Sequence, residues 1–126
     1  MADTNRPPPV LLDVRTEAEY AVSHLPGARR VDSRASASQV VGPLERGRAV
    51  VTYCSVGYRS SQMAARLQKA GRTNVFNLDG SIFQWANEGR PLEQAGKPAK
   101  MVHPYNEAFG KLLREELRAQ VPAVKE

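Results

Sequence analysis

The sequence predicts a single α/β domain in which a small, mostly parallel sheet of about four strands lies between helices. Apolar runs of strand length alternate with helical patterns over residues 10–92, as is typical of such domains. The clearest run, at 49–54, is β-branched and nearly continuous, which indicates a strand buried on both faces. The chain has 126 residues, 41% of them hydrophobic and 25% charged, which fits one compact domain.

The N-terminal elements follow from local signals. Residues 1–9 are polar and proline-rich, so we expect a disordered or extended lead-in. An apolar run at 10–15 predicts the first strand. Thr16 and Glu19 then form a capping box, which predicts a short helix.

The next elements are predicted from periodicity and from Gly and Pro punctuation. Ser60 is the predicted cap of a helix whose apolar positions, Met63, Ala64, Leu67 and Ala70, follow the 3.6-residue period up to Gly71. The remaining predictions are a turn at 25–28, a short strand near 30–31, a possible helix at 36–41, a strand at 75–78, a turn at 79–80 and a short helix at 82–87.

The C-terminal part has a different composition. Residues 93–103 are predicted to be a linker, of which residues 93–100 carry no core. Residues 104–126 are predicted to form an amphipathic helix, spanning 106–120, and a tail. Its apolar stripe could pack back on the domain or contact another chain.

Composition excludes several functional classes. The single Cys54 excludes an internal disulfide and a multi-cysteine zinc cluster, and His24 and His103 are too far apart for a local metal motif. No apolar run could span a bilayer and no secretory leader is visible, so we expect a cytoplasmic protein without a membrane partner.

The net charge of +5 is unevenly distributed. Residues 29–72 contain nine basic and two acidic residues, a net charge of +7. This window includes Cys54, so an anionic substrate or an acidic partner is one interpretation, and separately solvated side chains are the other. Nucleic-acid binding is not expected, because aromatic residues make up only 6% of the chain and do not interleave with the basic ones.

Cys54 is the candidate nucleophile. A cysteine at the carboxyl end of a parallel strand lies where open α/β sheets bind ligands. The following loop can turn its N–H groups toward the sulfur, and the next helix adds its positive dipole end; both effects favour a thiolate, as would a nearby Arg59. The alternative is a small buried hydrophobic residue. Against it stand the small, polar residues Ser55, Gly57 and Ser60, which suit an anion-binding nest.

Four motifs, in this order, resemble those of a single-domain rhodanese. They are Leu12-Asp13-Val14-Arg15-x-x-x-Glu19-Tyr20, Ser23-His24-Leu25-Pro26-Gly27-Ala28, Cys54-Ser55-Val56-Gly57-Tyr58-Arg59-Ser60-Ser61 and Leu78-Asp79-Gly80-Ser81-Ile82-x-x-Trp85. They fall within residues 10–92. The resemblance implies a rhodanese-like three-layer sandwich and a thiosulfate-type sulfurtransferase without a cofactor or metal.

The resemblance also implies roles for individual residues. Cys54 would be the catalytic residue that carries sulfur as a persulfide. The loop amides of Ser55, Val56, Gly57, Tyr58, Arg59 and Ser60 would bind the outer sulfur, with Arg59 closing the loop. Asp13 and Arg15 would form a buried pair that supports the loop. His24 is interpreted as a structural histidine and Trp85 as core packing.

The expected partners are a small anionic sulfur donor and an external acceptor, namely a thiol, cyanide or a partner protein. The alternative function is a sulfur-carrier or redox-sensing interaction module with slow turnover. Phosphatases and arsenate reductases on this fold have five residues between cysteine and arginine, whereas four separate Cys54 from Arg59. The narrower loop favours sulfur over an oxyanion.

Two departures from the family pattern affect these expectations. Only nine residues precede Val10, so the domain is N-terminally abbreviated relative to the family and one sheet edge would be exposed. The C-terminal helix or a second copy of the chain could cover that edge, which makes a homodimer possible. Ser81 replaces a glycine that is common in the family, and we expect it to alter a turn without touching the chemistry.

Overall fold

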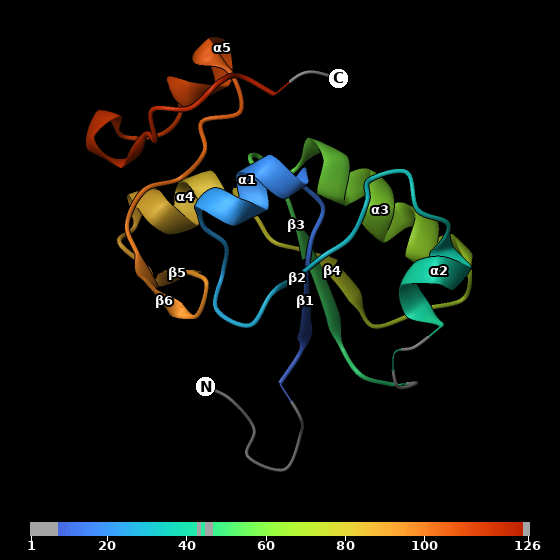
Figure 1. The fold of residues 1–126 in the computed structure, drawn as a ribbon. Helices are drawn as coiled ribbons and strands as arrows, with labels where there is room; N and C mark the ends of the chain where they lie inside the picture. The colour runs from blue at the N-terminus through green and yellow to red at the C-terminus, as the bar shows by residue number, and fades with distance from the viewer. Residues whose placement is uncertain (1–7, 43, 45–46, 125–126) are drawn as a thin grey trace.

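The computed structural model describes residues 8–42, 44 and 47–124 of the chain. Four parallel strands form the main sheet, in the order β2-β1-β3-β4 (Figure 1). Their bounds are β1 Val10–Asp13, β2 Arg29–Arg30, β3 Val50–Tyr53 and β4 Val75–Asn77. Asp13, at the end of β1, pairs in register with Tyr53, at the end of β3. The predicted fold class is therefore confirmed.

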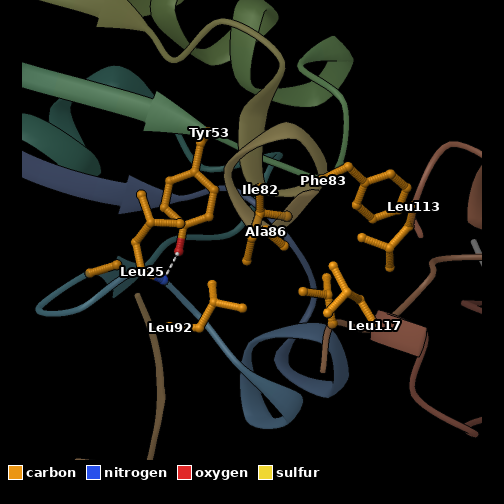
Figure 2. Close-up of a cluster of buried hydrophobic side chains, with 10 residues drawn as sticks. Leu25, Tyr53, Ile82, Phe83, Ala86, Leu92, Leu113 and Leu117 are labelled. Atoms are coloured by element: carbon orange, nitrogen blue, oxygen red, sulfur yellow. Dashed lines mark hydrogen bonds between the residues drawn. The ribbon is translucent and has the colours of Figure 1, made fainter. Parts of the chain in front are cut away.

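Helices cover both faces of this sheet. They are α1 Glu17–Val22, α2 Ala37–Val41, α3 Tyr58–Lys69 and α4 Ser81–Asn87. Val10 and Val50 pack with Met63 of α3 on one face. Tyr53 packs with Ile82 and other α4 residues on the other face (Figure 2). Neighbouring strand residues point to opposite faces, so a nearly continuous apolar strand fills two cores at once. Among the described helices, none has the length and apolar character needed to cross a membrane.

The segment predicted as a linker contains a hairpin. Strands β5 Leu92–Gln94 and β6 Lys97–Ala99 pair antiparallel, joined by a turn in which Ala95 has φ 50°. Val102, beyond the hairpin, is fully buried in the cluster that contains Ile82 of α4. The predicted linker over 93–103 is therefore wrong, because two short strands pair through their backbones, which composition does not reveal, and Val102 joins the core.

The predicted C-terminal helix over 106–120 is also wrong. The structure has only α5 Glu107–Gly110 and a 3₁₀ turn at Glu115–Leu117, separated by an extended Arg114 with ψ 137°. Leu113 and Leu117 are buried beside α4 (Figure 2), whereas Leu112 stays exposed. Burial of two leucines against the domain outweighs the local helical pattern, since a helix this short gains most of its stability from tertiary packing. Of the apolar stripe, Leu113 and Leu117 pack back on the domain.

The C-terminal segment, residues 102–124, lies over the end of the molecule that contains α1 and α4 (Figure 1). Asn87 at the end of α4 anchors it: its Nδ2 donates to the Leu112 carbonyl and its Oδ1 accepts the Arg114 N–H, both at 2.9 Å. Strand β4 remains at one end of the strand order. The C-terminal segment does not extend the sheet, and the homodimer stays a prediction.

Candidate active site

Cys54 directly follows β3 and is 1% exposed. The backbone N–H of Gly57 donates to its Sγ at 3.1 Å, and the Ser60 hydroxyl donates to the same sulfur at 3.4 Å. Gly57 has φ 113°, which glycine adopts without the clash that a side chain would cause. Two donors are therefore directed at one sulfur.

Helix α3 begins three residues earlier than predicted. Gly57 occupies its cap position and makes no side-chain capping bond, whereas Ser60 lies buried inside the first turn. The hydroxyl expected to cap the helix therefore points to Cys54 instead. The twelve-residue helix also directs its positive dipole end toward the loop that holds the sulfur.

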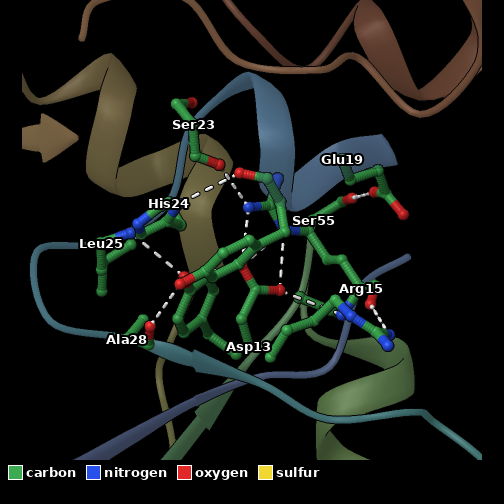
Figure 3. Close-up of polar contacts among 12 residues, drawn as sticks. Asp13, Arg15, Glu19, Ser23, His24, Leu25, Ala28 and Ser55 are labelled. Carbon is green, nitrogen blue, oxygen red and sulfur yellow. Dashed lines mark hydrogen bonds and ion pairs between the residues drawn. The ribbon is translucent and has the colours of Figure 1, made fainter. Parts of the chain in front are cut away.

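An ion pair closes the loop on the side of α1. Arg59 donates from Nη1 to Glu19 Oε1 at 2.8 Å and from Nη2 to Oε2 at 3.0 Å. Ser55 adds a hydroxyl bond to Glu19 Oε2 at 2.9 Å and accepts one from Arg59 Nη2 at 3.0 Å. Figure 3 shows Glu19 and Ser55 meeting below α1. The arrangement ties the second and sixth residues of the Cys54–Arg59 loop to one carboxylate.

The charges of this cluster stabilise one another. Burial alone would raise the pKa of Glu19, but the hydrogen bonds and charge of Arg59, with the charge of Arg15, lower it to about 2. Burial alone would lower the pKa of Arg59, but Glu19 and, to a lesser degree, Cys54 raise it. Both groups are therefore ionised at neutral pH.

Glu19 is a site residue that the sequence analysis missed. Its signal was present, because it lies in the first of the four motifs and at the third position of the capping box. The capping box is also present, with the Thr16 N–H donating to Glu19 Oε1 at 3.1 Å. One carboxylate thus caps α1 and holds the catalytic loop, and only the first role is visible in a local pattern.

Asp13 and Arg15 form the buried ion pair that was expected. Arg15 Nη2 lies 2.7 Å from Asp13 Oδ2 and also donates to the Ser23 carbonyl at 2.6 Å (Figure 3). The Tyr53 hydroxyl donates to Asp13 Oδ2 at 2.8 Å. The pair is therefore linked by a hydrogen bond to Tyr53, the residue before Cys54. Its support of the loop stays a prediction.

The loop side chains of Tyr58 and Val56 lie in different environments. Tyr58 is 69% exposed, whereas Val56 packs against the cluster that contains Leu113. The guanidinium of Arg59 lies 4.8 Å from the ring centre of Tyr105, a cation–π contact with the C-terminal segment. The C-terminal segment thus contacts the loop at Arg59 through Tyr105, a contact for which the sequence analysis gave no signal.

The remaining predicted residues lie outside this cluster. The His24 ring stacks on Tyr20 at 3.8 Å between centroids, and its Nε2 lies 3.5 Å from Glu93, so it joins α1 to the hairpin. Trp85 packs against the core and donates to the Pro91 carbonyl at 2.7 Å. In the part of the chain that the structure describes, His, Cys, Asp and Glu side chains form no group that could hold a metal ion.

The start of α4 holds the other side of the loop. The N–H groups of Ile82 and Phe83 donate to the carbonyls of Cys54 and Ser55, each at 3.1 Å. Because a trans peptide directs its C=O and N–H to opposite sides, these bonds turn the following amides of the loop away from α4. The first turn of α4 therefore sets the orientation of the peptide planes next to the sulfur.

The comparisons agree with this architecture. The family model for the Rhodanese-like domain matches residues 1–88. The crystal structure of a Rhodanese_3-like domain from Anabaena sp. has a TM-score of 0.62 and 28% identity, over 68% of this chain and 98% of that one.

Three curated relatives are similar to parts of this chain. A protein of Allochromatium vinosum named "Sulfurtransferase" is 36% identical over 83 residues, which are 66% of this chain and 77% of the relative. The "Probable adenylyltransferase/sulfurtransferase MoeZ" of Mycobacterium tuberculosis is 33% identical over 82 residues, 64% of this chain and 21% of MoeZ. A "tRNA uridine(34) hydroxylase" of Pectobacterium carotovorum is 32% identical over 106 residues, 77% of this chain and 29% of the relative. The chain thus spans only a small part of the last two.

Proposed function

The chain belongs to the rhodanese-like domain family, and on that premise we propose that it is a sulfurtransferase in which Cys54 carries a sulfane sulfur as a persulfide. The observation that carries the proposal is the pair of donors, the Gly57 N–H and the Ser60 hydroxyl, directed at Cys54 Sγ. The name "Sulfurtransferase" of the Allochromatium vinosum relative supports the same class of reaction.

The reaction has two balanced steps. The Cys54 thiolate attacks the outer sulfur of thiosulfate; the new S–S bond forms, the old one breaks, and sulfite leaves with the electron pair. An acceptor thiolate or cyanide then attacks the outer sulfur of the persulfide. The acceptor leaves as a persulfide or as thiocyanate, and the Cys54 thiolate is restored. No general base is needed once the thiolate has formed.

The net charge of +7 over residues 29–72 supports a small anionic donor, and the sequence requires an external acceptor. The sequence contains one cysteine, so a thiol acceptor comes from another molecule, either a small thiol or a partner protein. The reducing cytoplasm, where the sequence leads us to expect this protein, supplies such thiols.

Arg59 distinguishes sulfur transfer from phosphoryl or arsenate chemistry. A loop that binds a tetrahedral oxyanion needs its arginine free to contact the anion. Here both Nη atoms of Arg59 bind Glu19. The loop also has only four residues between Cys54 and Arg59. Both observations favour a single extra sulfur atom as the bound group.

A sulfur-carrier or redox-sensing module is the second candidate function. The observation that favours it is the 1% exposure of Cys54, together with the contact of Arg59 with Tyr105 of the C-terminal segment. A sulfur so enclosed reacts only when the loop opens, which would slow turnover and protect a bound persulfide.

Intact-protein mass spectrometry tests the proposal. Incubation with thiosulfate should add one sulfur atom to the native chain, and cyanide should remove it as thiocyanate. The Cys54→Ala variant should gain nothing. Rapid turnover with both reagents would indicate a free-standing enzyme, and a stable persulfide with slow turnover would indicate the carrier. The absence of any sulfur uptake by the native chain would refute both.

A further inference from the structure

Ser81 is the first residue of α4 and has an unusual backbone conformation. Its φ is 50°, in the left-handed region, and it directly follows Gly80 with φ 72°. A residue with a Cβ in this region carries an energy cost that glycine avoids. Ser81 is also fully buried. A residue in such a conformation persists only where contacts with the surrounding structure offset the energy cost.

The Ser81 hydroxyl contacts the backbone of the nucleophile. Its Oγ accepts the Cys54 N–H at 3.2 Å and donates to the Leu78 carbonyl at 3.3 Å. The hydroxyl thus bridges the end of β3 to the end of β4, where a direct backbone bond would otherwise be expected. The expectation that Ser81 affects only a turn is therefore incomplete, because the same residue binds Cys54.

The hydroxyl also lies next to the residue that donates to the sulfur. A Cβ added at Gly57 would stand 3.7 Å from Ser81 Oγ, in ordinary contact. The Cys54 carbonyl is held at the same time by the Ile82 N–H at 3.1 Å. Cys54 is therefore fixed through both its backbone N–H and its carbonyl by two consecutive residues of α4.

We propose that Ser81 is a positioning residue for sulfur transfer, whose hydroxyl holds the Cys54 backbone so that the sulfur stays within hydrogen-bond distance of the Gly57 N–H. The inference rests on the proposed function. Glycine at this position would relieve the backbone cost but would leave the Cys54 N–H without its partner. Serine at this position thus has an unfavourable backbone conformation, but its hydroxyl holds the Cys54 backbone in place.

Two substitutions separate this role from a structural one. Ser81→Ala removes the hydroxyl and keeps the unfavourable φ, whereas Ser81→Gly removes the hydroxyl and relieves it. Ala95→Gly is the matched control, because exposed Ala95 has the same φ of 50° in the β5–β6 turn. Each variant is tested for its melting temperature, its sulfur uptake from thiosulfate and the pH profile of Cys54 alkylation by iodoacetamide.

The expected result is that reactivity does not follow stability. Ser81→Ala should melt at a lower temperature than Ser81→Gly, yet both should take up sulfur about 3- to 10-fold more slowly, the loss expected for one hydrogen bond. Both should shift the alkylation profile to higher pH. A change in access to the sulfur alters the alkylation rate by the same factor at every pH. The midpoint of the pH profile therefore moves only if the surroundings of the sulfur change. Ala95→Gly should alter stability alone.

Two outcomes would overturn the proposal. Native uptake and a native profile in both Ser81 variants would make the residue a turn component only. Native behaviour of Ser81→Gly with impaired Ser81→Ala would assign the effect to backbone geometry instead of the hydroxyl. A shifted profile in variants of a protein that takes up no sulfur would instead refute the proposed function and leave the positioning role intact.

Discussion

Arg59 binds both carboxylate oxygens of Glu19, at 2.8 and 3.0 Å, and so links the end of the catalytic loop to α1. The Glu19 carboxylate is fully buried and the Arg59 side chain is 15% exposed. An ion pair that is enclosed in this way is costly to break, because removal of one partner leaves the other charged and poorly solvated. The loop geometry therefore depends on a residue 35 positions before the cysteine.

Glu19→Gln should destabilise the protein by about 2–4 kcal/mol at pH 7, somewhat less than a fully buried pair would lose. Arg59 would keep a neutral partner but lose its counter-charge, and Ser55 would lose a charged acceptor. Sulfur uptake should slow as the loop loosens. Glu17→Gln, on the exposed side of the same helix, is the matched control and should change little in urea unfolding and in uptake. Equal stability of the two variants would contradict the role assigned to Glu19.

The stability conferred by Glu19 should depend on pH in a defined window. Its pKa is about 2 in the folded protein, below the ordinary value of 4.5, so the unfolded chain binds the proton more readily. The contribution is complete above pH 4.5 and is lost as pH falls toward 2, with a total on the order of 3 kcal/mol. The stability difference between the native protein and Glu19→Gln should therefore shrink between these limits. A difference that stays constant from pH 6 to pH 2 would contradict the assignment.

The sequence predicted the fold well because the fold rests on local, repeated signals. The strands of the main sheet could be identified from apolar runs and turn signals, and α3 from its period and its stop, whereas the β5–β6 hairpin was missed. The position of Cys54, at a strand end before a helix, follows from those elements alone. The role of Glu19 could not be predicted by the same means, because its contact with Arg59 depends on how α1 packs against the loop.

The C-terminal segment shows a second limit of sequence patterns. Leu113 and Leu117 have helical spacing, but no continuous helix joins them. Both are nevertheless buried, because their packing partners lie on α4. The contact of Tyr105 with Arg59 likewise joins residues 46 positions apart. Such contacts arise from tertiary packing, which periodicity does not encode.

Tyr53→Phe should destabilise the junction of the strand ends. The Tyr53 hydroxyl donates to Asp13 at 2.8 Å and accepts the Leu25 N–H at 3.1 Å (Figure 2), so its removal leaves two buried groups each short of a partner. We expect a loss of about 1–3 kcal/mol in urea unfolding. Tyr20→Phe is the comparison, since its half-buried hydroxyl bonds only the Ala28 carbonyl, and it should lose less. Equal losses would show that the Asp13 contact adds nothing.

Tyr105→Asn should make Cys54 more accessible. The Tyr105 ring lies 4.8 Å from the Arg59 guanidinium, and its backbone has φ 69°, which asparagine tolerates better than most residues. Loss of the cation–π contact should lower the free energy of loop opening by about 0.5–2 kcal/mol. Alkylation of the 1% exposed Cys54 should then accelerate by about 2- to 30-fold if the loop must open for the reagent to enter.

The control for this prediction is Leu112→Ala, a 60% exposed side chain on the same segment. It should leave the alkylation rate unchanged, because its side chain contributes little to the buried cluster. Hydrogen exchange of the loop amides should rise in Tyr105→Asn at the same time, since both measurements report opening. Faster alkylation without faster exchange would mean that the ring blocks the reagent directly, and an unchanged rate would mean that the C-terminal segment does not restrain the loop.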